Sequence, residues 1–134
     1  MDSRTRQFVR RRAGERCEYC RLPQAAHEER FSVDHVIAVQ HRPDDAPENL
    51  AFSCLRCNLY KGPNLSGIDP VSNQITRLFN PREQVWREHF EWSGPVIVGL
   101  TPAGRATVAV LQMNAPERVQ LRHALIDEGL LTLD

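Results

Sequence analysis

The pattern of apolar and polar positions predicts two short strands and a helix in the first half of the chain. Residues 30–37, RFSVDHVI, are rich in β-branched and aromatic side chains and predict a strand. Residues 40–49, QHRPDDAPEN, are rich in proline, aspartate and asparagine and predict a loop. Residues 50–53, LAFS, predict a second strand, and residues 54–61 predict a helix that ends at Gly62 and Pro63. The predicted order is strand, loop, strand, helix.

The second half predicts a helix, a hairpin and another helix. Residues 80–83, NPRE, supply the cap, proline and glutamate of a helix start, so we expect a helix to about Phe90. The apolar runs 95–100 and 105–113 flank Thr-Pro-Ala-Gly, which predicts a β-hairpin. Residues 114–117 repeat the helix start, and this helix should run to about Glu128.

These elements predict an α+β fold in one compact unit. A core at residues 1–63 should carry the small C-terminal annex at residues 64–134. The 134 residues are 41% hydrophobic and 25% charged, as in ordinary globular proteins. No apolar run approaches the roughly 18 residues of a membrane span. The N-terminus, MDSRTRQFVRRR, has no apolar stretch after its charges, so we expect a cytoplasmic protein without a membrane partner.

The basic residues are concentrated at the N-terminus, although the formal net charge is zero. Six of the first sixteen residues are arginines, and Lys61 is the only lysine. Arginine suits bidentate contacts to phosphate. We predict nucleic-acid contacts from Arg10, Arg11, Arg12 and Lys61. The competing interpretation of the arginine cluster is a solvated helix face.

Four cysteines in two C-x-x-C pairs predict a structural zinc site. The pairs are CEYC, with Cys17 and Cys20, and CLRC, with Cys54 and Cys57. Two residues between thiolates let one tight turn present both sulfurs to a single ion, and two such turns complete a tetrahedral Zn–S₄ site. Disulfides or free core thiols are the alternatives, and the lack of a secretory signal disfavours disulfides. The 33 residues between the pairs must carry structure of their own.

The residues between and beside the cysteine pairs resemble the HNH endonucleases. Asp34 and His35 are followed by Asn49, fourteen residues after the histidine, and by Asn58 within CxxCNxxKG, twenty-three residues after it. The resemblance covers Arg16–Gly62. It implies a ββα-metal core, also called the His-Me finger, with zinc-ribbon-like knuckles formed by the four cysteines. It also implies DNA as the partner and hydrolysis of a phosphodiester bond as the reaction.

The resemblance also implies a role for each polar residue. His35 would be the general base, because a neutral imidazole accepts a water proton near neutral pH. Asp34 and Asn58 would bind a catalytic divalent ion, since carboxylate and amide oxygens suit Mg²⁺ or Mn²⁺. Asn49 would hold the loop that orients the histidine. Related colicin-type sequences have histidines where Asn58 and Gly62 stand, which favours Mg²⁺ over Zn²⁺ or Ni²⁺ here.

Adjacent residues of a regular strand point to opposite faces, so Asp34 and His35 can approach one phosphate only if the strand bends or ends there. We expect that it does. Two other functions remain open. A non-catalytic, zinc-stabilised module for DNA binding or other interactions explains the cysteines and arginines equally well. An RNA-directed nuclease would use the same phosphate chemistry.

Overall fold

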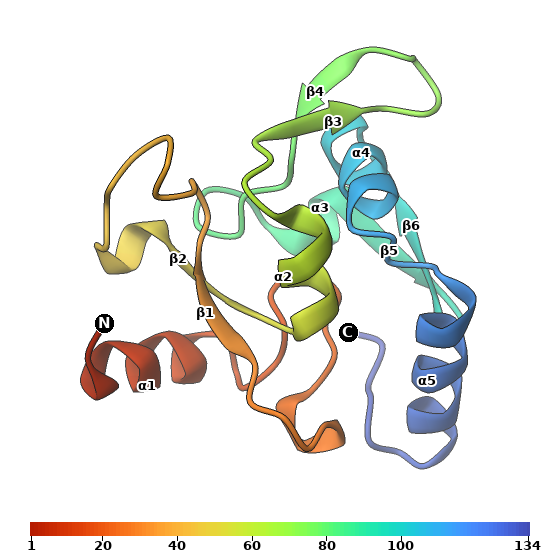
Figure 1. Cartoon of the computed structure of the whole chain (residues 1–134). Coiled ribbons are helices and arrows are strands. Elements are labelled where there is room, and N and C mark those ends of the chain that lie inside the picture. The colour runs from red at the N-terminus through yellow and green to blue at the C-terminus, as the bar shows by residue number, and fades with distance from the viewer.

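The structure is a computed structural model that describes residues 1–134, and it consists of three two-stranded antiparallel sheets and five α-helices (Figure 1). The helices are α1 (Ser3–Arg12), α2 (Leu55–Lys61), α3 (Trp86–His89), α4 (Pro102–Val110) and α5 (Pro116–Asp127). The strands are β1 (Ser32–His35), β2 (Leu50–Ser53), β3 (Ser66–Ile68), β4 (Ile75–Arg77), β5 (Phe90–Ser93) and β6 (Val96–Gly99). Two 3₁₀ turns, η1 (Gln24–Ala26) and η2 (Pro47–Asn49), lie in loops. The fold class is α+β, as predicted.

The predicted strand–loop–strand–helix unit is confirmed by β1, β2 and α2. In the β1–β2 pair, Asp34 lies opposite Ala51 and His35 lies opposite Leu50. α2 begins at Cys54, whose sulfur accepts a hydrogen bond from the backbone N–H of Cys57. It ends at Gly62, whose φ of +49° lies in the left-handed region that favours glycine. Local turn and cap chemistry therefore determines this unit.

The arginine-rich N-terminus forms α1, which packs on β1 and β2. The Asp2 side chain caps this helix by accepting from the backbone N–H of Thr5. Val9 is fully buried and anchors the helix, while most of its other residues are exposed. Figure 1 shows α1 beside the β1–β2 hairpin, on the side away from β5 and β6.

The predicted hairpin of residues 95–100 and 105–113 is wrong. Residues 102–110 form α4, and β6 pairs with β5 through a turn at Gly94 and Pro95. Thr101 caps α4 by accepting from the N–H of Gly104, and Pro102 occupies the first turn. This Thr-Pro pair is a helix start that the β-branched residues of the segment obscured.

The predicted helix of residues 80–90 is also mostly wrong. Asn80 accepts from the N–H of Arg82 in a turn, and only Trp86–His89 is helical.

The β3–β4 hairpin was not predicted. It is tied to α4 by buried Asp69, whose two carboxylate oxygens accept from Arg105 Nε and Nη2, each at 2.8 Å. The hydrogen bonds from Arg105 hold the pKa of Asp69 well below its usual range. The last helix, α5, is confirmed.

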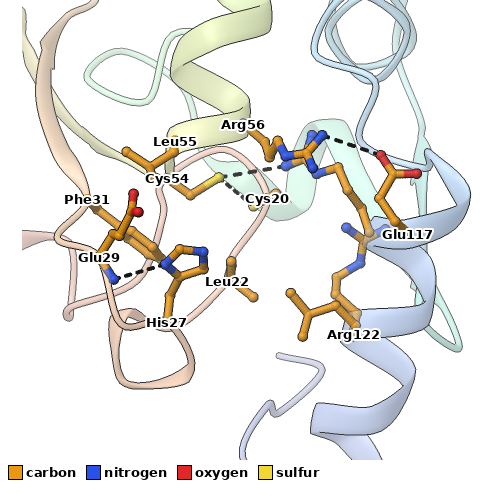
Figure 2. Close-up of a pocket in the computed structure, with 12 residues that line it drawn as sticks. Cys20, Leu22, His27, Glu29, Phe31, Cys54, Leu55, Arg56, Glu117 and Arg122 are labelled. Carbon is orange, nitrogen blue, oxygen red and sulfur yellow. Dashed lines mark hydrogen bonds and ion pairs between the residues drawn. The ribbon is translucent and has the colours of Figure 1, made fainter.

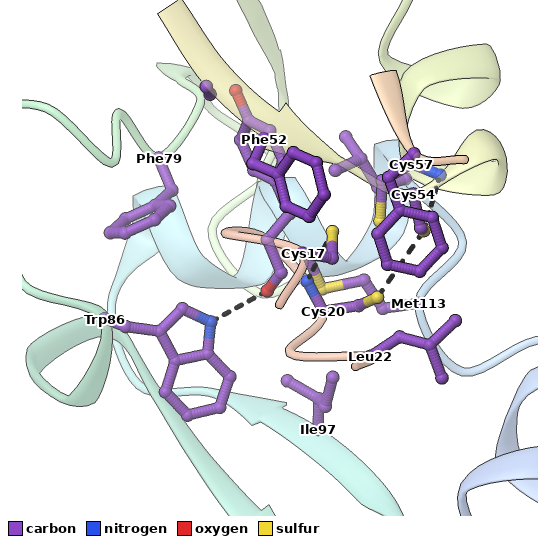
Figure 3. Packing of buried hydrophobic residues seen from close by; sticks show 14 of the residues in the cluster. Cys17, Cys20, Leu22, Phe52, Cys54, Cys57, Phe79, Trp86, Ile97 and Met113 are labelled. Atoms are coloured by element: carbon purple, nitrogen blue, oxygen red, sulfur yellow. Dashed lines mark hydrogen bonds between the residues drawn. The ribbon is translucent and has the colours of Figure 1, made fainter. Parts of the chain in front are cut away.

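One hydrophobic cluster of 22 buried residues includes side chains from both halves of the chain (Figure 3). The indole N–H of Trp86 donates to the backbone oxygen of Tyr19 at 2.7 Å. Arg82 forms an ion pair with Glu18, which also accepts from the N–H of Phe52. The first cysteine turn is thus held by residues of the C-terminal half. The boundary after residue 63 stays a prediction.

None of the helices combines the length and apolar character that crossing a membrane requires.

Candidate functional site

The four cysteines form a single cluster with the geometry of a metal site. Their sulfur atoms all lie within 4.8 Å of one another, and every side chain is buried. Sulfurs bound to one tetrahedral zinc at 2.3 Å would lie about 3.8 Å apart, and Cys20 Sγ lies 3.6 Å from Cys54 Sγ. Within each pair, the backbone N–H of the second cysteine points at the sulfur of the first, at 3.5 and 3.4 Å. The set fits a zinc ion.

The electrostatics of the cluster favour a bound cation. Burial raises the pKa of Cys17 and of Cys57. Four buried sulfurs can therefore not all be thiolates unless positive charge compensates them. A divalent ion provides that compensation, and soft thiolate ligands suit zinc.

A side chain of α5 supplies part of the positive charge that compensates the thiolates. Arg118 Nη2 donates to Cys57 Sγ at 3.0 Å and to Cys54 Sγ at 3.7 Å. Its Nη1 donates to the backbone oxygens of Leu111 and Gln112, so the buried guanidinium is well satisfied. Burial opposes the charge of Arg118, but the neighbouring thiolates outweigh it and raise the pKa of the guanidinium above its usual value. Arg118 is a contact to the sulfurs that no local sequence signal indicated.

A pocket of about 420 Å³ separates the first cysteine turn from α5 (Figure 2). Cys20 and Cys54 lie on one side of it, and Arg122 and Glu117 project from α5 on the other. Arg56 and Glu117 form an exposed ion pair at 3.5 Å across its edge. Arg118 and Arg122, the arginines of α5, line this pocket and donate to backbone oxygens and, for Arg118, to sulfur.

Asp34 and Asn58 lie on the side of the hairpin that α2 covers. Asp34 is two residues after Ser32 and therefore shares its strand face. Asn58, on α2, donates through Nδ2 to Ser32 Oγ at 3.3 Å. This bond leaves the amide oxygen of Asn58 available as a ligand. A carboxylate and an amide oxygen, which are both suitable ligands for a hard divalent ion, thus lie on facing elements.

His35 is the last residue of β1, so the expectation that the strand ends or bends here is confirmed. Its Nε2 lies 2.6 Å from Oδ1 of Asp45, which belongs to the loop before β2. The imidazole is 19% exposed and the Asp45 side chain 79% exposed. If Nε2 carries the proton and donates it to Asp45, Nδ1 is the free acceptor. Sequence reasoning missed Asp45, because its loop showed only turn composition.

Asn49 is buried and holds the two ends of this loop together. Its Oδ1 accepts from the N–H of Ile37, and its Nδ2 donates to the oxygens of Ile37 and Asp44. These contacts connect the residues just after His35 with the segment that carries Asp45. The predicted role of holding the loop fits this geometry.

The surroundings of Lys61 disfavour its predicted contact with nucleic acid. Its side chain is only 2% exposed, and Nζ donates to the backbone oxygen of Val36 at 2.8 Å. Burial lowers the pKa of this ammonium, and the nearby charge of Asp34 opposes the shift. A buried lysine in this position supports the turn after His35 and does not reach a phosphate in the solvent.

The three predicted arginines of α1 differ in their surroundings. Arg10 forms an exposed ion pair with Glu15 at 2.8 Å. Arg12 donates to the backbone oxygen of Leu50 and lies over the ring of Phe8. Arg11 is exposed and forms no ion pair. Arg12 therefore has a structural contact that competes with its predicted contact to DNA.

Comparison with known proteins gives one match. Residues 17–64 match the family model described as HNH endonuclease. The match confirms the resemblance inferred from Arg16–Gly62, and it contains both cysteine pairs and all four polar residues of the motif. No curated protein and no solved structure matched the chain.

Proposed function

We propose that this chain, whose residues 17–64 match the HNH endonuclease family model, is a metal-dependent endonuclease that hydrolyses phosphodiester bonds in DNA. The observation that carries the proposal is the position of His35 at the end of β1, next to Asp34, with Asn58 of α2 facing the same strand. A zinc-stabilised module that only binds nucleic acid would have no need for this set of residues.

In this proposal, His35 takes the proton from the attacking water. Asp45 orients the ring through Nε2, at 2.6 Å, so that Nδ1 accepts the proton. Asn49 and Lys61 hold the backbone just after the histidine, at Ile37 and Val36, and thereby help to fix its position. General-base assistance of this kind accelerates a reaction by roughly 10²–10⁴.

The alternation of the strand suits the geometry of the reaction. In-line displacement places the attacking and leaving oxygens on opposite sides of phosphorus. His35 and Asp34 point to different sides of β1, and both lie where the strand ends. A phosphate at this end would have the histidine on one side and the oxygens of Asp34 and Asn58 on the other.

Asp34 and Asn58 would hold a divalent ion, Mg²⁺ or Mn²⁺, which neutralises charge on the phosphate and stabilises the leaving oxygen. Neither residue is an imidazole or a thiolate, so the pair favours a hard ion over zinc. The four cysteines would hold the separate, structural zinc. The two sites then differ in chemistry, because buried thiolates serve one and oxygen ligands the other. Thiols stay available for zinc in a reducing compartment, which accords with the expected cytoplasmic location.

The experiment is cleavage of supercoiled plasmid by purified protein with Mg²⁺, Mn²⁺ or EDTA, and with single-stranded RNA as a second substrate. We expect cleavage of DNA that requires added Mg²⁺ or Mn²⁺ and stops in EDTA. His35→Ala should lower the rate by roughly 10²–10⁴ and leave zinc content unchanged.

The matched control is His123→Ala, which removes an exposed histidine on α5, far along the chain from the motif. It should cut like the wild type. Equal rates for wild type and His35→Ala would identify the activity as a contaminant and leave the binding module as the function. Cleavage of RNA alone would reassign the substrate.

A further inference from the structure

A groove of about 360 Å³ lies between α1 and the start of β1, and its lining is strongly basic. Arg4, Arg6 and Arg10 line it from α1, and Arg30 lines it from the segment before β1. Its ten lining residues include no aspartate and no glutamate. A concave surface with four arginines and no carboxylate attracts an anionic ligand.

The helical repeat explains why Arg6 and Arg10 lie together there. Positions 3, 6, 7 and 10 follow the spacing of one face of an α-helix, and all four line the groove. Val9 lies outside this set and is buried in the core. Arg4, Arg6 and Arg30 form no ion pair within the chain, and all three are exposed. Their charges are therefore available to a ligand.

The residues of β1 that line the groove project from the same face of the strand as His35. Val33 and its cross-strand partner Phe52 contribute to its floor. His35 is two residues after Val33 and shares that face by the pleat. Arg30 is five residues before His35, a distance of at most about 16 Å along an extended chain. That length corresponds to about five base pairs of DNA at 3.4 Å each.

We propose that this groove binds backbone phosphates of duplex DNA, to one side of the phosphate that is cut and within about five base pairs of it. The inference rests on the proposed function, and it assigns the DNA contact to Arg4, Arg6 and Arg30, in addition to Arg10. The planar guanidinium of arginine can donate two parallel hydrogen bonds to the oxygens of one phosphate. The apolar floor of Phe31 and Val33 suits the sugar side of the backbone.

The test is binding of a fluorescent 30-base-pair duplex in EDTA, which prevents cleavage, across a series of salt concentrations. The groove variant is Arg6→Gln combined with Arg30→Gln. Glutamine has nearly the helix propensity of arginine, so α1 should persist. The control is Arg56→Gln combined with Arg87→Gln, which removes two exposed arginines outside the groove.

The groove variant should bind about tenfold or more weakly at low salt, and its slope of log affinity against log salt should fall by up to about two. The control should stay within about twofold of wild type. Equal DNA affinity and equal salt dependence of the two variants would contradict the proposal that the groove binds DNA, even if wild type cuts plasmid with Mg²⁺. Absence of plasmid cleavage by wild type would instead overturn the proposed function, so the two failures are distinguishable.

Discussion

Arg118 and Cys57 are 61 residues apart in the sequence, and the guanidinium of the first donates to the sulfur of the second at 3.0 Å. The contact joins the last helix to the second cysteine pair. Arg118 also donates to the backbone oxygen of Leu111, which follows α4. A C-terminal segment that carries none of the HNH motif is therefore part of the environment of the proposed zinc ion.

Arg118→Ala should weaken zinc binding by about 10- to 100-fold, the range for partners that support metal ligands. It removes the compensating charge and also leaves the oxygens of Leu111 and Gln112 without a donor. The measurement is competition for zinc with a chromophoric chelator. Arg118→Lys keeps the positive charge but loses the several fixed N–H donors of the guanidinium, so its zinc affinity should lie between those of wild type and Arg118→Ala. Arg87→Ala, which removes an exposed arginine of α3, is the control, and zinc affinity equal to this control would contradict the prediction.

Cys54→Ser should leave the chain unfolded or aggregated. Structural zinc sites contribute about 10–16 kcal/mol of binding free energy to folding. Serine is itself a good helix cap, so the substitution keeps the cap of α2 and tests the metal ligand. Metal analysis of wild type should find one zinc per chain, and a strong chelator should reproduce the unfolding seen by circular dichroism. A folded wild type without zinc would refute the site.

Asp34→Ala and Asn58→Ala should abolish cleavage or raise the Mg²⁺ concentration that it requires. Both residues are only partly buried, so neither change should unfold the protein. Asn58→Asp keeps an oxygen ligand and should retain activity. Ser32→Ala is the matched control, because it removes the hydrogen bond to Asn58 but no ligand. The readout is the cleavage rate across an Mg²⁺ titration, and wild-type curves for both alanine variants would rule out this metal site.

Asp45→Ala should slow cleavage by up to about tenfold, which corresponds to the net value of one hydrogen bond. The carboxylate is largely exposed, so the effect should be smaller than that of His35→Ala. Asp45→Asn keeps an acceptor oxygen and should restore most of the rate. The loss should appear in kcat and leave KM unchanged, since Asp45 acts through His35. An asparagine variant as slow as the alanine variant would show that hydrogen bonding to the ring is not its function.

The core of the domain could be predicted because its signals are local. The C-x-x-C spacing makes a turn by itself, and Cys54 and Gly62 mark the two ends of α2. Strand and loop composition marked β1, the loop and β2. The motif residues lie on this unit, so their spacing in the sequence already carried most of their arrangement in space.

Tertiary structure decided the rest, because the deciding contacts are between residues far apart in the chain. The segment ATVAV has the β-branched composition of a strand, but residues 102–110 are a helix that buries Ala106 and Thr107. Lys61 was predicted to contact nucleic acid, but its side chain is buried and donates to the backbone oxygen of Val36. The sequence by itself determined the cysteine turns and the ends of α2, whose bonds close within a few residues. Only the folded chain brought Arg118 to Cys57 and Asp45 to His35, since the position of a charged side chain depends on the packing of its helix or loop and leaves no local pattern.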